Sequence, residues 1–247
     1  MEGHVWAAAI VIALLASACQ SLTGFGFALV FVPLLSLFWD VKAAVVTCIM
    51  LGPVLTLPLL ATSWRLASGR RVLVLLLGSA AGLPLGLYLL QVASAEVLGL
   101  LVGSLVIVFC LAIYRGARIP SERGDGVLAP LVGMVSGALR AATSMGGPPV
   151  VLYLLGRDCE APVFRATALA YFAPLSIMSI AGVAAVGQVD GDVLVASAAV
   201  LPALAVGMAL GQWLRPRVRE SAFQLISLSI LLGAGVSMVI VSSLRLA

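Results

Sequence analysis

The sequence has very few of the side chains that do chemistry in water. It contains one histidine, His4, and one lysine, Lys42, among 247 residues, and only 10% of its residues are charged. A typical soluble domain is about 25% charged. His4 precedes the first apolar run and Lys42 lies between two runs, so the apolar segments hold no Ser–His pair, no Ser–Lys pair and no cluster of metal ligands. The composition therefore speaks against an enzyme, and we expect no metal or other cofactor.

Cysteine is scarce as well, and the positive charge is of an unusual kind. Because Lys42 is the single lysine, arginine supplies 13 of the 14 basic residues, and most of these lie in short polar segments. That placement is typical of membrane-protein loops and gives no reason to expect a nucleic-acid partner. The cysteines lie far apart without a Cys-x-x-Cys motif, so we expect apolar packing for Cys19, Cys48, Cys110 and Cys159.

Apolar residues make up 62% of the chain, which is more than a soluble core can bury. We therefore expect an all-α polytopic membrane protein with the lipid bilayer around it. No Lys or Arg precedes the first apolar run, so we expect that run to be retained and not cleaved as a signal peptide. The apolar blocks cover 5–38, 43–63, 72–93, 97–114, 126–156, 163–187, 192–212 and 221–244.

Six blocks have the length of one crossing, about 20 residues, but the first and fifth are longer and are interrupted. The interruptions are "TGFGF" at 23–27 and "TSMGGPP" at 143–149. A shift of 120 residues aligns them, so that Thr23 meets Thr143 and Gly26 meets Gly146. Gly-x-x-x-Gly follows in each half, at 82–86 and at 207–211, with a shift of 125. We therefore predict two membrane repeats, 1–119 and 126–247, joined by a cytoplasmic linker at 120–125.

Loop charges predict the topology of these repeats. If every block crossed the membrane once, the basic residues of the loops and block ends, Arg140 apart, would divide almost evenly between the two sides. If blocks one and five enter and return to the same side, eleven lie on one side, and only Lys42 and Arg245 lie on the other. The positive-inside rule favours the second arrangement. It predicts about six full crossings, two re-entrant hairpins, inverted repeats, and both termini outside a cytoplasmic (inner) membrane. Such repeats with discontinuous helices are typical of secondary transporters.

The two interruptions are the candidate substrate site. Broken membrane helices expose backbone groups only against protein or a water-filled cavity. Pro148 suits the first turn of a new helix, so we expect short helices from about 148 to 156 and from about Phe27. Their N-termini would favour an anion between the two breaks. The candidate substrate-binding residues are Gln20, Ser21, Thr23, Gly24, Gly26, Arg140, Thr143, Ser144, Gly146, Gly147 and Pro148.

Arg140 is the most testable of these residues. Its guanidinium suits oxyanions because its donors form a fork. It could instead reach the membrane interface or donate to backbone carbonyls at a helix end. Helix–helix hydrogen bonds are an alternative explanation for Gln20, Ser21 and Ser144. No Asp or Glu lies in the middle of an apolar block, which favours an anion over a cation as the substrate.

These segments resemble a known family. "GFGFALVFVPLL" in the first half, and "GGPPVVLYLL" followed by "FRATALAYF" in the second, are similar to the sulfite exporter TauE/SafE family, also called the 4-toluene sulfonate uptake permease family. The resemblance covers nearly the whole chain. It implies transport of sulfite, organosulfonates or related sulfur and carboxylate anions. Arg140 departs from the small or neutral residue expected there, which either strengthens anion preference or marks a subgroup with another substrate.

The sequence thus predicts a secondary transporter for small anions. An anion channel with its pore between the re-entrant arms is the alternative, and a non-transporting membrane scaffold is a third class. A homo-oligomer is left open.

Overall fold

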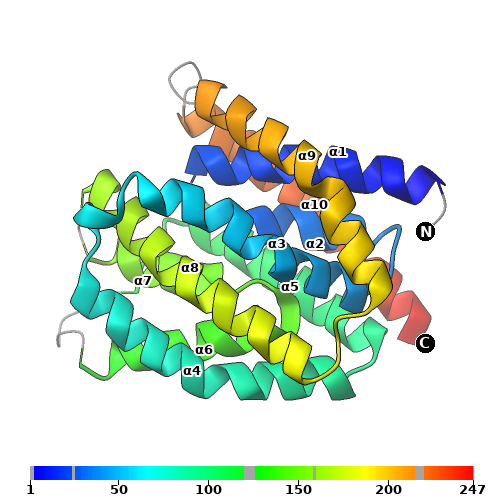
Figure 1. Ribbon diagram of the computed structural model, residues 1–247, viewed down its shortest axis with the longest axis horizontal. Helices are drawn as coiled ribbons and strands as arrows, with labels where there is room; N and C mark the ends of the chain where they lie inside the picture. The colour runs from blue at the N-terminus through cyan, green and yellow to red at the C-terminus, as the bar shows by residue number, and fades with distance from the viewer. Residues whose placement is uncertain (1–2, 24–25, 120–125, 158–159, 215–219, 247) are drawn as a thin grey trace. The chain divides into compact units, whose positions relative to one another are not determined.

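The computed structural model is all-helical in the residues that it describes, which are 3–23, 26–119, 126–157, 160–214 and 220–246. The linker 120–125 and Gly24 lie outside these ranges. Figure 1 shows the arrangement of the helices. Their bounds are α1 Gly3–Thr23, α2 Phe27–Leu35, α3 Val41–Ala61, the short 3-10 helix η1 Trp64–Leu66, α4 Gly69–Val92, α5 Ala95–Tyr114, α6 Leu128–Thr143, α7 Gly147–Leu155, α8 Ala161–Ala185, α9 Gly191–Leu214 and α10 Glu220–Leu246.

Six helices in the described residues are long and apolar enough to cross a membrane. They are α1, α3, α4, α5, α8 and α9, and the polytopic, all-α class predicted above is therefore confirmed. α1 has 21 residues, so at 1.5 Å per residue it is about 30 Å long and can reach across a bilayer by itself. α6 has 16 residues and is shorter than the other helices that begin an apolar block.

The chain forms two compact units, and neither is a continuous half of the sequence. Unit 1 contains residues 1–48, 93–115 and 190–247, and therefore α1, α2, α5, α9, α10 and the first part of α3. Unit 2 contains residues 49–92 and 116–189, and therefore the rest of α3, η1, α4, α6, α7 and α8. Each unit thus takes helices from both predicted repeats, and each contains one helix break.

Unit 2 is built on close contact between α4 and α6. The backbone of Gly82 lies so near the carbonyl of Met134 that a Cβ added there would overlap it, and Gly86 lies against the carbonyl of Ala138 in the same way. The pairs advance together along both helices, so α4 and α6 are parallel. Small residues let helix backbones approach this closely in membranes.

α4 and α8 are also parallel. The backbone N–H of Ser68, just before α4, donates to Thr167 Oγ1 near the start of α8, over 3.1 Å. Gln91 Nε2, at the end of α4, donates to the carbonyl of Val186 just past the end of α8, over 3.2 Å. A third contact in unit 2 involves α7, where the carbonyl of Leu152 accepts the N–H of Ile119 over 3.1 Å. The segment after α5 therefore lies beside the end of α7.

Unit 1 repeats the glycine packing with other helices. A Cβ at Gly207 in α9 would overlap the carbonyl of Leu14 in α1, and one at Gly211 would lie 2.5 Å from the carbonyl of Ala18, so α1 and α9 are parallel. α5 packs on α10 in the opposite sense, because Gly99 lies against Ser242 and Gly103 lies against Gly235 and Val239.

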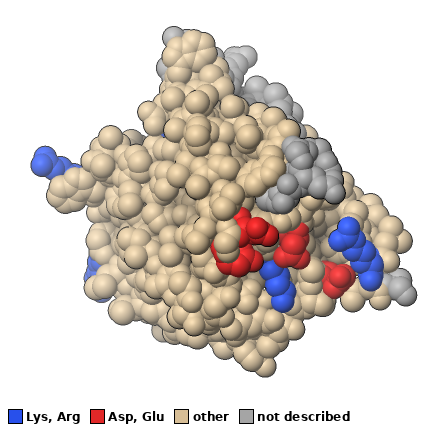
Figure 2. Space-filling view, turned by 45° about the vertical axis from the view of Figure 1, so that its right-hand side comes forward, with Lys and Arg blue, Asp and Glu red and all other residues tan. Residues whose placement is uncertain are grey.

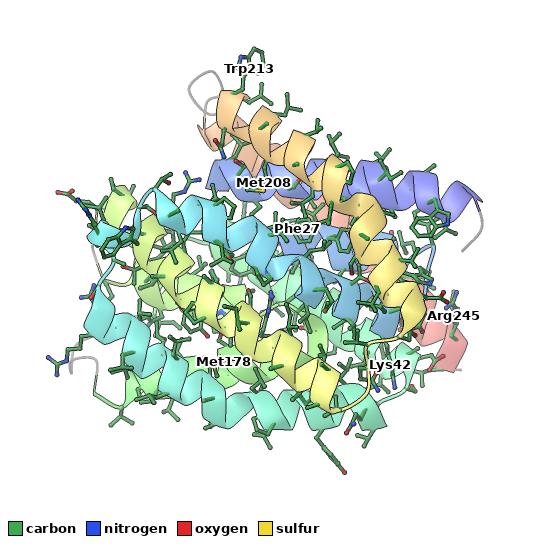
Figure 3. All side chains as sticks on the ribbon, viewed as in Figure 1. Phe27, Lys42, Met178, Met208, Trp213 and Arg245 are labelled. Atoms are coloured by element: carbon green, nitrogen blue, oxygen red, sulfur yellow. The ribbon has the colours of Figure 1, made fainter. Side chains whose placement is uncertain are left out.

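Charged side chains are few and gathered. The face drawn in Figure 2 is largely without charge, and its Asp and Glu residues lie close together in one area. Figure 3 shows Lys42 and Arg245 at the same end of unit 1. Large apolar side chains are exposed on the outer faces of the helices, as lipid contact requires, for example Leu77, Leu85, Val108 and Val206.

Candidate functional site

The second helix break is a tight turn between α6 and α7. α6 ends at Thr143, Ser144 adopts a left-handed backbone conformation with φ 63°, and α7 begins at Gly147. The N–H of Ser144 donates to the carbonyl of Arg140 over 2.9 Å, which closes the last turn of α6. A residue other than glycine at positive φ is uncommon and costs free energy, so it persists only where its surroundings hold it there. The contacts around the break therefore hold Ser144 in this conformation. α7 starts within one residue of the predicted position.

Arg140 reaches from the last turn of α6 to a second helix. Its Nη1 donates to the carbonyl of Ser144 over 3.3 Å, and its Nη2 donates to Ser176 Oγ in α8 over 3.2 Å. The side chain is half-buried. The expectation that Arg140 could bond a carbonyl at a helix end is met by the first contact, while the second contact directs the rest of the fork toward α8.

Gly52 in α3 completes this cluster. A Cβ at Gly52 would overlap Nη2 of Arg140 and would lie 2.8 Å from Ser176 Oγ. Residues of α3, α6 and α8 thus meet at the guanidinium. Because Gly52 has no side chain, the guanidinium can occupy the space beside it. Sequence reasoning missed Gly52 and Ser176, because both lie in ordinary apolar helices and only the fold brings them to Arg140.

Ser144 presents a buried hydroxyl at the break. The residue is 1% exposed, and its Oγ has no hydrogen-bond partner in the described part of the chain. Thr143, also fully buried, donates to the carbonyl of Leu139 over 2.7 Å and accepts the N–H of Met145 over 3.3 Å. A buried polar group without a partner is costly, so the Ser144 hydroxyl is placed to bond a ligand or water.

The start of α7 has few backbone donors. Pro148 and Pro149 lack N–H groups, so Gly147 supplies the one N–H among the first three residues of the helix. Gly147 is half-buried, and the nearest side-chain atom to a Cβ added there is Phe172 Cζ at 3.7 Å. Gly146 packs against α6, and its carbonyl accepts a hydrogen bond from Ser136 Oγ. At this break the donors for an anion are therefore mainly side chains.

The first helix break, in unit 1, is held differently. Gly26 precedes α2 with φ 109°, and the N–H of Phe27 donates to Gln20 Oε1 over 3.0 Å. The Gln20 amide oxygen thus caps the N-terminus of α2, the position where an anion was expected. Ser21 Oγ donates to the carbonyl of Met208 in α9 over 3.0 Å, which is a helix–helix hydrogen bond. Figure 3 labels Phe27 and Met208 in this unit.

The predicted site residues therefore fall into two groups. Unit 2 brings together Arg140, Thr143, Ser144, Gly146, Gly147 and Pro148 at the second break. Unit 1 holds Gln20, Ser21 and Gly26, and Thr23 is the last residue of α1, with its side chain outside the described residues. Gly24 also lies outside them. That the two breaks share one substrate stays a prediction.

Comparison with known proteins identifies the chain at the level of its family. No curated protein and no solved structure matches it. The family model described as sulfite exporter TauE/SafE matches residues 9–238, which is nearly the whole chain and includes both helix breaks. The predicted resemblance is therefore confirmed. The chain belongs to the sulfite exporter TauE/SafE family of membrane transporters and is not an enzyme.

Proposed function

We propose that this protein is a secondary transporter that moves small anions across the cytoplasmic membrane, and that the second helix break binds the anion. Sulfite, organosulfonates and related sulfur or carboxylate anions are the candidate substrates. One observation carries the proposal, namely the Arg140 guanidinium held at a membrane-helix break beside the buried hydroxyl of Ser144. The family match supports the class of substrate.

The chemistry of unit 2 favours an anion over a cation. The helices that form this unit, α3, α4, α6, α7 and α8, contain no Asp or Glu. Positive charge and hydroxyl donors therefore dominate the interior around the break. A guanidinium donates to an oxyanion through two parallel hydrogen bonds, and such charge-assisted bonds are stronger than bonds between neutral groups. Ser144 Oγ and the N–H of Gly147 are further donors at the same turn.

Helix directions support a re-entrant α6–α7 arm. α5 and the α6–α7 arm lie between the parallel helices α4 and α8 in the sequence. If both α5 and the α6–α7 arm crossed the membrane, α4 and α8 would run in opposite directions. α5 has 20 apolar residues and is long enough to cross, so we infer that α6–α7 enters and returns. The contact between Ile119 and Leu152 fits this reading, because it places the last part of the arm beside the segment that follows α5.

The same reasoning applies to α1 and α2. α1 and α9 are parallel, and α3, α4, α5 and α8 lie between them as four crossings when α6–α7 returns. An even number of crossings gives parallel α1 and α9 only if α2 turns back toward the side from which α1 entered. We therefore infer that α1–α2 is the second re-entrant arm, even though α1 alone has the length of a crossing.

Helix contacts also support an inverted repeat. Gly82 contacts Met134 in unit 2, and Gly207 contacts Leu14 in unit 1. The glycines differ by 207 − 82 = 125 positions and their partners by 134 − 14 = 120, which are the two shifts predicted from the sequence. Gly86 with Ala138 and Gly211 with Ala18 give the same pair of differences. Each unit therefore pairs the broken segment of one repeat with the third apolar block of the other.

We expect cysteine labelling to place both ends of the α6–α7 arm in the cytoplasm. In a variant without native cysteines, Ala117→Cys and Ala161→Cys flank this arm, and Ser94→Cys lies between α4 and α5. A membrane-impermeant maleimide added to intact cells should label position 94 and should spare positions 117 and 161 until the cells are opened. Labelling of position 161 in intact cells, with position 117 protected, would mean that the arm crosses, and would remove the inverted topology.

Transport in proteoliposomes tests the function itself. Vesicles loaded with unlabelled sulfite should accumulate external radiolabelled sulfite transiently above its equilibrium level, because a carrier exchanges the two pools. An anion channel would let label equilibrate without this overshoot. Sulfite, thiosulfate, a sulfonate and a short carboxylate should be compared in parallel by thermal shift, where a ligand at 100 times its Kd stabilises by about 2.7 kcal/mol. If all of these anions fail to stabilise and fail to exchange, the proposal is wrong.

A further inference from the structure

A chain of buried hydroxyl groups connects two helices to the second break. Tyr171 in α8 lies between Ser79 in α4 and Ser136 in α6, and its Oη is 2.7 Å from the Oγ of each. Ser136 Oγ in turn bonds the carbonyl of Gly146, the residue before α7. Tyr171, Ser79 and Ser136 are fully buried. Three helices and the turn are therefore tied together by side-chain hydrogen bonds.

The proton order in this chain is fixed between Tyr171 and the turn. The Gly146 carbonyl can only accept, so the single hydroxyl proton of Ser136 is directed to it. The oxygen of Ser136 then accepts the proton of Tyr171. Ser79 can donate to Tyr171, and its Oγ also lies 2.8 Å from the carbonyl of Leu75 and 2.9 Å from that of Gly133. Such a chain is satisfied only as a whole, so the loss of one hydroxyl affects the next bond.

The end of the chain lies directly against Arg140. Ser136 and Arg140 are four residues apart and therefore lie on the same face of α6. Gly146 packs onto that face, and a Cβ added to it would lie 2.8 Å from Arg140 Cβ and 3.0 Å from Ser136 Oγ. The bond from Ser136 thus fixes the turn against the stem of Arg140, while Arg140 Nη1 bonds Ser144 two residues earlier in the same turn.

The first break has no counterpart of this chain. The predicted repeat relates Ser136 and Tyr171, by the shift of 120, to Ala16 and Leu51, and it relates Ser79, by the shift of 125, to Leu204. All three of these residues are buried and apolar. The hydroxyl chain is therefore a feature of the arm that carries the arginine, as expected if it serves the arginine and not the fold common to both halves.

The geometry points to Tyr171 as a positioning residue: through Ser136 it holds the Gly146 carbonyl and thereby keeps the turn in the shape that presents Arg140 and Ser144 to the anion. The role of the anion here rests on the proposed function. The claim that Tyr171 holds the turn does not rest on the proposed function, because it concerns only hydrogen bonds in unit 2. We call this part of the inference the hold on the turn. The two parts can therefore be tested separately.

The hold on the turn is tested by the reactivity of a cysteine placed at Ser144. In a variant whose four native cysteines are replaced, Ser144→Cys should react slowly with a methanethiosulfonate reagent, because position 144 is 1% exposed. Tyr171→Phe removes one oxygen and keeps the ring, so the protein should still fold. It should raise the labelling rate about tenfold, the factor that corresponds to about 1.4 kcal/mol. That is about the contribution of one hydrogen bond.

Two further variants give this measurement its specificity. Ser136→Ala should raise the labelling rate at least as much as Tyr171→Phe does, because it removes the bond to the Gly146 carbonyl itself. The double variant should be no faster than Ser136→Ala, since Tyr171 acts on the turn through Ser136. Ser179→Ala is the matched control, because Ser179 is a fully buried serine of α8 that donates to the carbonyl of Leu175 within its own helix, over 2.7 Å. It should leave the labelling rate unchanged.

Sulfite transport tests whether the turn serves the anion. With Ser144 intact, Tyr171→Phe should raise the half-saturating sulfite concentration five- to tenfold with a smaller change in maximal rate, and Ser179→Ala should change neither. An unchanged labelling rate in Tyr171→Phe overturns the inference. So does a faster labelling rate with an unchanged half-saturating concentration, because Tyr171 would then hold the turn without serving the site. If the unmodified protein moves none of the tested anions, the proposed function fails, and the labelling rates alone decide the hold on the turn.

Discussion

Replacing Arg140 with glutamine should lower sulfite transport by about 100-fold while the protein still inserts and folds. Losing one partner of a buried, charge-assisted contact costs about 2–5 kcal/mol, and each 1.4 kcal/mol is about tenfold. The guanidinium is the positive group that unit 2 places at the second break, and a neutral amide of similar length cannot replace its charge. Arg140→Lys should retain part of the activity, because it keeps the charge and loses the fork.

The matched control for this experiment is Arg65→Gln. Arg65 belongs to the same unit but is exposed in η1, where it lies over the ring of Trp64 at 5.5 Å from the ring centroid. Removing it changes the net charge equally and leaves the break untouched, so transport should stay within about twofold of the original rate, as surface substitutions usually alter stability by less than 0.5 kcal/mol. Near-normal transport by Arg140→Gln, measured at equal amounts of inserted protein, would exclude Arg140 from substrate binding.

The two breaks were predictable because the residues that cause them are neighbours in the sequence. Glycine and proline are poor in helix interiors, and adjacent prolines suit only the first turn of a helix, so α7 could be placed within a residue of its observed start at Gly147. The start of α2 at Phe27 was predicted from the proposed repeat in the same way. These features depend on neighbouring residues along the chain, and the lengths of the apolar blocks depend only on the thickness of a bilayer.

The surroundings of Arg140 were not predictable for the opposite reason. Gly52 lies within α3, and Ser176 and Tyr171 lie within α8, two continuous helices. A serine in a membrane helix most simply bonds its own preceding turn, as Ser176 does to the carbonyl of Phe172 over 2.7 Å. Only tertiary packing brings these residues to the break. The one local signal was Ser136, which lies four residues before Arg140 and so shares its face of α6.

The role of Gln20 was open in the sequence for a chemical reason. An amide side chain has both donors and an acceptor, so its position opposite Arg140 in the predicted repeat could mean either a ligand for an anion or a helix–helix hydrogen bond. In the structure its oxygen accepts the N–H of Phe27, so it forms a helix cap instead. At positions that the predicted repeat aligns, the Gln20 oxygen thus accepts a hydrogen bond at the first break, and the Arg140 guanidinium donates at the second.

Replacing Gly82 or Gly207 with alanine should be among the most damaging of the conservative substitutions in the helix interiors. In each case the added methyl group would overlap a backbone carbonyl of the parallel helix, that of Met134 for Gly82 and that of Leu14 for Gly207. Overpacking costs about 1–3 kcal/mol where side chains can give way. A backbone carbonyl cannot rotate aside, so we expect the upper end of that range, and about 10 °C in melting temperature for a chain of this size.

Gly233 provides the matched control, since the same substitution meets open space there. It lies within α10, and nothing comes within 4 Å of a Cβ placed on it. Alanine is a better helix former than glycine by about 1 kcal/mol, so Gly233→Ala should keep or slightly raise the melting temperature of the purified protein.

The predicted repeat adds a stricter expectation. Because Gly82 and Gly207 occupy equivalent positions in the two units, their alanine variants should lower the melting temperature by similar amounts. A large loss at one glycine with none at the other would mean that the two parallel pairs, α4 with α6 and α1 with α9, are not equivalent supports of the fold.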